Sequence, residues 1–148
     1  MNQEIKARWV AALRSGEYPQ AINRLRAEDG YCCLGVLCEL AVADGVISNL
    51  GMGEDGGFLY GINPEGQMAG GEPETSDTVL PKAVIEWAGI ERIDGGSPMV
   101  TADESWIPKL NLHSVPPDDL DQVPTELAGL NDLGMSFTDI ADIIEEQL

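Results

Sequence analysis

Residues 31–40 read Tyr31-Cys32-Cys33-Leu34-Gly35-Val36-Leu37-Cys38-Glu39-Leu40, the most apolar run of the chain and the place where all three cysteines gather. From Leu34 to Ala43, apolar residues cover nearly the whole circumference of a helix, and a helix of this kind is buried. Asp44-Gly45 supplies its end. The sequence therefore predicts a central helix over 34–43, against which the other elements pack.

The three cysteines favour a structural role. Their odd number prevents complete pairing within one chain, and their spacing lacks the paired pattern of zinc ligands. We expect reduced thiols that behave as small core hydrophobes, with Cys33 or Cys38 substantially buried. A cysteine nucleophile with His113 as its base is the alternative, although no activating partner lies nearby in the sequence.

The composition restricts the classes of function. The 148 residues carry a formal net charge of −18, and 43% of them are hydrophobic. Length and apolar content predict one domain, residues 1–148, with its own core. Eight Lys and Arg are too few for binding to nucleic acid or to an anionic membrane surface. Free cysteines, with no apolar leader or membrane-spanning run, predict a cytoplasmic protein.

The first half of the chain predicts a helix, a hairpin and a loop. Residues 3–14 have helical periodicity, and Ser15-Gly16 ends that helix. Residues 21–26 alternate apolar and polar, 27–30 form a turn, and a second run begins at Tyr31, which predicts a β-hairpin. Residues 45–77 are interpreted as an acidic, glycine-rich loop or insert of mobile turns, with a lid as one reading and Phe58-Leu59-Tyr60 as a brief strand.

The second half predicts helices separated by short extended pieces. Leu80-Pro81 begins a helix that ends at Gly89. Extended pieces follow at 99–101 and 107–112, a short helix spans 125–133, and Ser136 with Asp139 caps the last helix. The predicted fold is α+β: a compact single domain with a buried central helix, short antiparallel strands or hairpins, and a C-terminal helix pair. The acids of that pair would repel a DNA duplex, so the pair is expected to be structural.

Positive charge concentrates near the N-terminus, where five of the eight Lys and Arg lie within residues 1–31. A nucleotide site needs arginine for phosphate and an aromatic plane for the base. Both occur in this segment, so the predicted ligand-binding residues are Trp9, Arg14, Tyr18, Arg24, Arg26 and Tyr31. Trp9 also has a reading as a core anchor, because tryptophan buries a large area. No catalytic residue, metal ligand or cofactor is predicted.

Several segments carry a resemblance. They are Trp9-Val10-Ala11-Ala12-Leu13-Arg14-Ser15-Gly16-Glu17-Tyr18-Pro19-Gln20, Cys32-Cys33-Leu34-Gly35-Val36-Leu37-Cys38, Leu80-Pro81 with Trp87-Ala88-Gly89, and Leu130-Asn131-Asp132 with Ser136-Phe137 and Ile140-Ala141-Asp142. In them the chain resembles a group of small uncharacterised bacteriophage proteins; the acidic glycine-rich insert is not covered. The resemblance implies a phage accessory protein that acts in the cytoplasm of an infected bacterium.

Small phage proteins of this kind often antagonise host defence. The expected function is a non-enzymatic sponge, a protein that binds and sequesters a nucleotide-derived immune signal of the ADP-ribose or cyclic nucleotide type. The alternative is an acidic DNA mimic or protein-binding inhibitor of a host defence enzyme, which fits the charge of −18. Many acids, however, lie in the glycine-rich stretch and look solvating. The partner is thus a nucleotide-type ligand or a host protein, and homo-oligomerisation stays open.

Overall fold

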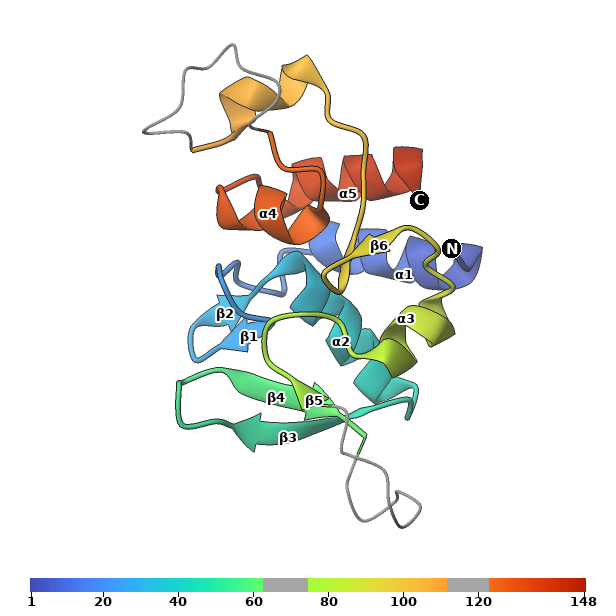
Figure 1. Ribbon diagram of the computed structural model, residues 1–148, viewed down its shortest axis with the longest axis vertical. Helices are drawn as coiled ribbons and strands as arrows, with labels where there is room; N and C mark the ends of the chain where they lie inside the picture. The colour runs from blue at the N-terminus through green and yellow to red at the C-terminus, as the bar shows by residue number, and fades with distance from the viewer. Residues whose placement is uncertain (63–74, 112–122) are drawn as a thin grey trace.

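The structure, a computed structural model, describes residues 1–62, 75–111 and 123–148 (Figure 1). Its helices are α1 (Gln3–Arg14), α2 (Cys33–Ala43), α3 (Lys82–Ala88), α4 (Leu127–Asp132), α5 (Phe137–Gln147) and the 3₁₀ helix η2 (Glu104–Lys109). Its strands are β1 (Arg26–Ala27), β2 (Gly30–Tyr31), β3 (Ser48–Met52), β4 (Phe58–Gly61), β5 (Thr75–Ser76), β6 (Ile93–Asp94) and β7 (Ser97–Pro98). The predicted α+β class is confirmed.

The central position of α2 is confirmed as well. Figure 1 shows this helix crossing the middle of the molecule, between the sheet of β3, β4 and β5 and the helices α4 and α5. Gly35 lets α2 approach the chain before β1, since a methyl carbon at this position would lie 1.6 Å from the carbonyl oxygen of Leu25. The end of the helix follows the prediction, with Asp44 as its C-cap and Gly45 at a φ of 75°.

The predicted end of α1 and the predicted N-cap of α5 are confirmed, whereas the N-cap of α1, Asn2, was not predicted. In α1 the Asn2 side chain accepts hydrogen bonds from the N–H groups of Glu4 and Ile5, and Gly16 follows the helix with a φ of 75°. In α5 the Ser136 hydroxyl accepts from the Asp139 N–H and donates to its carboxylate. Helices α1 and α5 pack against each other, and the chain termini lie on the same side of the view in Figure 1.

The predicted hairpin is present, but the strand predicted at 21–26 is wrong. Only Arg26–Ala27 pairs with Gly30–Tyr31. The preceding residues bend, with Asn23 at a φ of 66°, a conformation that asparagine tolerates better than most residues. Two of their N–H groups bond elsewhere: the Asn23 N–H donates to the Asp132 carboxylate, and the Leu25 N–H to the Asp77 carbonyl. The Ala21 N–H and the Leu25 carbonyl still bond to Tyr31 and Cys32. Tertiary partners therefore replaced a longer strand ladder.

The described part of the glycine-rich stretch, residues 45–62 and 75–77, contains a three-stranded sheet. Strands β3, β4 and β5 form an antiparallel sheet in that order. The brief strand predicted at Phe58-Leu59-Tyr60 is confirmed as β4, whereas β3 and β5 lie where the sequence predicted mobile turns. The register shifts between Asn49 and Met52, where Gly51 has a φ of 93°. This bulge breaks the alternation by which a strand is recognised. Residues 63–74 of the predicted loop lie outside the described residues.

The extended piece predicted at 107–112 is wrong over its described part. Residues 104–109 form η2, which begins where the Asp103 carboxylate accepts from the Ser105 N–H at 2.8 Å. Pro108 has no backbone N–H, so a strand at this position would lack one hydrogen bond of its ladder. The piece at 99–101 does pair, through a bridge between Met99 and Glu126. A short hairpin of β6 and β7, turned by Gly95-Gly96, was not predicted.

The helix predicted at 125–133 is α4, and one of its side chains organises the core. Asn131 is fully buried; its amide oxygen accepts from the Cys33 N–H and from the Gln20 amide, and its amide nitrogen donates to the Ala21 carbonyl. A buried amide satisfied in this way fixes the relative position of the elements that it joins. Asn131 therefore ties α4 to the start of α2 and to the connector after α1.

The cysteines behave as expected for core residues. Cys32, Cys33 and Cys38 are all free and all buried. Burial raises the pKa of the Cys32 thiol to about 11, so the thiol stays protonated at neutral pH. His113, the base in the alternative reading, lies outside the described residues. Within ranges 1–62, 75–111 and 123–148, no helix is long and apolar enough to cross a membrane.

Candidate functional site

The structure separates the six predicted ligand-binding residues into four surroundings. Trp9 lies in the core, fully buried, and its indole N–H donates to the Cys33 carbonyl at 2.9 Å. The side chain therefore anchors α1 on α2 and offers no exposed face for stacking. The buried position of Trp9 therefore does not support the prediction that it binds a ligand. It agrees with the alternative prediction that Trp9 anchors the core.

The structure brings three of the predicted residues together in an aromatic stack, which consists of Tyr18, Arg26, Tyr31 and Phe58. The Cζ atom of Arg26 lies 5.0 Å from the ring centroid of Tyr31 and 4.2 Å from that of Phe58. Tyr18 packs edge-on against Tyr31, with 5.2 Å between centroids. The guanidinium thus makes cation–π contacts that join the β1–β2 hairpin to β4.

A carboxylate completes the surroundings of Arg26. Glu39 of α2 accepts a hydrogen bond from the Arg26 guanidinium at 3.4 Å and a second one from the Tyr60 hydroxyl. Burial and the hydrogen bond to Glu39 raise the pKa of Tyr60 well above its ordinary value, which keeps the phenol protonated as a donor. Two rings and one carboxylate therefore already engage the charge of Arg26.

Arg24 points to a different partner. Its Nη1 atom lies 2.6 Å from the Asp77 carboxylate, and the Leu25 N–H donates to the Asp77 carbonyl at 2.7 Å. Gly57 lies beneath the side chain, since a Cβ atom there would be 2.8 Å from Arg24. The pair thereby ties the segment before β1 to the residue that follows β5.

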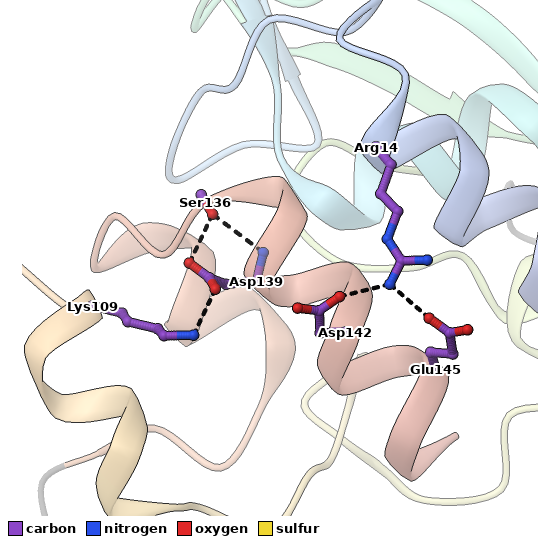
Figure 2. Close-up of polar contacts among 6 residues, drawn as sticks. All are labelled: Arg14, Lys109, Ser136, Asp139, Asp142 and Glu145. Carbon is purple, nitrogen blue, oxygen red and sulfur yellow. Dashed lines mark hydrogen bonds and ion pairs between the residues drawn. The ribbon is translucent and has the colours of Figure 1, made fainter.

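Arg14 lies on a third surface, the α1–α5 face, which we define by Lys6, Arg14, Asp142 and Glu145. Figure 2 shows the Nη2 atom of Arg14 between two carboxylates of α5, at 2.6 Å from Asp142 and 2.6 Å from Glu145. These hydrogen bonds raise the pKa of Arg14. Lys109 and Ser136 bind Asp139 on the same helix, so α5 is bonded along much of its length.

A groove of about 600 Å³ runs along this face. Small apolar side chains from α1 form part of its lining, and polar groups surround them. The lining residues are Gln3, Lys6, Ala7, Val10, Ala11 and Arg14 of α1, together with Glu145 of α5. Lys6 forms no ion pair with any residue in the described part of the chain, whereas Arg14 is doubly paired. Of the predicted site residues, Arg14 is the one that lines this groove.

The sequence analysis missed the groove as a site, and in particular Gln3, Lys6 and Glu145. A signal for the α1 side was present: Gln3, Ala7, Val10 and Arg14 recur at helical spacing, so they share one face. Glu145 had no such signal, because its proximity to Arg14 depends on how α1 packs against α5. The groove offers an amide, an ammonium and a carboxylate around an apolar floor, which are groups suited to binding a polar organic molecule.

Six of the eight Lys and Arg form ion pairs with carboxylates: Arg8, Arg14, Arg24, Arg26, Lys82 and Lys109. Most of the positive charge is therefore already matched within the fold, which leaves Lys6 as the groove cation best able to accept an external anion.

The comparisons with known proteins give a family and no function. No curated protein matches this chain. No solved structure matches it either. The model of one protein family matches over residues 1–148. The chain therefore belongs to the family described as a domain of unknown function, DUF8296.

Proposed function

We propose that this protein is a non-enzymatic accessory protein of a bacteriophage, a sponge that sequesters a nucleotide-derived immune signal in the groove on α1. The observation that carries the proposal is the groove itself, with a volume of about 600 Å³ and an unpaired Lys6 among the described residues. Pockets for organic ligands usually measure about 300–1,000 Å³. The phage origin rests on the resemblance of the sequence segments.

The lining of the groove matches the parts of a nucleotide. Ala7, Val10 and Ala11 form an apolar floor on which a base can lie. Lys6 supplies an ammonium for phosphate, and charge-assisted hydrogen bonds of this kind are stronger than neutral ones. Gln3 adds an amide that can donate to and accept from the edge of a base. Groups suited to the base and to the phosphate of a nucleotide are thus both present in the lining.

The net charge of −18 sets a condition on binding. An anionic ligand is repelled by the protein as a whole, so its affinity depends on close contacts and not on long-range attraction. Salt screens charges beyond about 8 Å at physiological ionic strength. We therefore expect nucleotide affinity to change little, or to rise slightly, when salt is added.

Calorimetry with cyclic dinucleotides and ADP-ribose tests the proposal. Lys6→Ala should weaken binding by about tenfold or more, which corresponds to the loss of one charge-assisted hydrogen bond. Lys82→Ala is the matched control, because Lys82 is an exposed cation on α3 that does not line the groove. Arg24→Ala and Arg26→Ala test the prediction from the sequence that these two arginines contact the anion.

Two results would contradict the sponge: wild-type protein that binds none of these nucleotides, or Lys6→Ala that binds them like wild type. A complementary measurement identifies the ligand directly. Protein purified from infected, defence-active cells should release a bound nucleotide on heating, which mass spectrometry of the released small molecules detects.

An acidic inhibitor of a host defence enzyme, acting as a DNA mimic or through another protein contact, is the second candidate. It is favoured by the ion pairing of six of the eight cations, which leaves an excess of carboxylates on the surface. A mimic should lose its partner steeply at about 0.5 M salt, where the screening length is a few ångströms. Amide variants of Glu54 and Asp55, exposed in the β3–β4 turn, should abolish mimicry and leave nucleotide binding unchanged.

A further inference from the structure

The two ends of the groove differ in charge. At one end Lys6 is a cation without an ion pair among the described residues. At the other end Arg14 is held by Asp142 and Glu145, so two negative charges outweigh one positive charge. Lys6 and Arg14 are eight residues apart on α1, a distance of about 12 Å along the helix axis. The groove therefore attracts an anion at the Lys6 end and hydrogen-bond donors at the Glu145 end.

Glu145 has one carboxylate oxygen to offer a ligand. Its Oε2 atom accepts from Arg14 at 2.6 Å, whereas Oε1 accepts no hydrogen bond from the part of the chain that the structure describes (Figure 2). An ionised carboxylate only accepts hydrogen bonds, so it repels phosphate and binds hydroxyl groups. Arg14 holds this carboxylate in one place and thereby acts as a positioning residue.

The donors of a nucleotide that suit such a carboxylate are the ribose hydroxyls. In other nucleotide-binding folds an acidic side chain recognises the ribose 2′-hydroxyl in this way. We infer that Glu145 reads the ribose, so that the groove takes ribonucleotides with free 2′- and 3′-hydroxyls, with phosphate at Lys6. This inference rests on the proposed nucleotide binding and adds the class of nucleotide.

The test compares ADP with 2′,3′-dideoxy-ADP by calorimetry. Wild-type protein should bind ADP about tenfold more tightly, as expected for hydrogen bonds to a charged acceptor. Glu145→Ala should reduce this ratio to about twofold or less. Glu146→Ala is the matched control, because it removes the same charge from the neighbouring, exposed position of α5 and leaves the groove lining intact.

A second variant separates positioning from packing. Arg14→Ala should lower the preference for ADP over the dideoxy compound, because Glu145 loses its anchor, while the unfolding transition stays in place. An equal affinity of wild-type protein for both compounds overturns the reading of Glu145 and leaves the proposed function standing. A failure of wild-type protein to bind ADP, ADP-ribose and cyclic dinucleotides overturns both.

Discussion

The α1–α5 face and the aromatic stack each contain an arginine bonded to carboxylates, yet they differ in what surrounds that arginine. Arg14 lies on an exposed surface beside a groove, with acids of α5 as its partners. Arg26 contacts the rings of Tyr31 and Phe58 and the carboxylate of Glu39, so its charge is already engaged within the fold. The comparison shows that an arginine near aromatic residues in sequence can be structural, while a paired arginine on a helix face can border a binding site.

Alkaline pH should have the largest effect on stability, because three thiols are buried at the start of α2, the helix that lies between the two regions. Burial raises the pKa of Cys32 from 9.0 to about 11 and raises those of Cys33 and Cys38 as well. Between these values the unfolded chain loses thiol protons that the folded protein keeps, so stability falls as pH rises. Cys32 alone should remove on the order of 3 kcal/mol between pH 9 and 11.

Denaturant unfolding at a series of pH values measures this loss, with the aromatic near-ultraviolet signal as a second probe. A Cys32→Ala variant should show a smaller decline over the same range, because it lacks that proton. An unfolding free energy that stays constant between pH 8 and 11 would contradict the burial of these thiols.

Gly35→Ala should push α2 away from the segment before the β1–β2 hairpin. It should therefore disturb the aromatic stack and not the α1–α5 face. The new methyl carbon would lie 1.6 Å from the Leu25 carbonyl oxygen, so the backbone must move. We expect a loss of about 3 kcal/mol or more, at the upper end of overpacking effects. Gly53→Ala is the control, since the nearest neighbour of its added methyl group lies at 3.4 Å, and it should change the free energy of unfolding by less than about 0.5 kcal/mol.

Arg26→Ala should cost about 2 kcal/mol of unfolding free energy, because it removes two cation–π contacts and leaves Glu39 half-buried without its cation. Arg26→Lys should restore only part of this loss, since an ammonium cannot stack as a flat guanidinium does. Full recovery in the lysine variant would indicate that charge alone matters here.

Arg14→Ala should have the smallest effect on stability, at most about 0.5 kcal/mol, because exposed ion pairs contribute little. Its effect should lie in ligand discrimination instead. Thermal unfolding of Arg14→Ala and Arg26→Ala under the same conditions compares the stability contributions of the two arginines directly. A larger loss for Arg14→Ala than for Arg26→Ala would reverse the roles assigned to the two regions.

The resemblance segments acquire a physical explanation from the structure. Cys33, Gly35 and Asn131 lie in them, and each makes a contact that the core requires. Trp9 belongs to the same set, through its hydrogen bond to the Cys33 carbonyl. Recurrence of these segments in related chains would therefore follow from folding alone, and it says little about a ligand.

The sequence by itself determined the α-helices α1 to α5 and the buried central position of α2, but not η2, because caps, glycine stops and apolar periodicity act over a few residues. It also determined where positive charge concentrates. Only the tertiary structure decided which of these cations pair with carboxylates of the protein and which can bind an external anion. Arg14 meets acids of α5, and Arg24 meets Asp77, across long separations in the chain. Such pairs form when packed elements come together, and no local pattern encodes them. The groove beside Lys6 and Glu145 has the same origin, since it lies where α1 packs on α5.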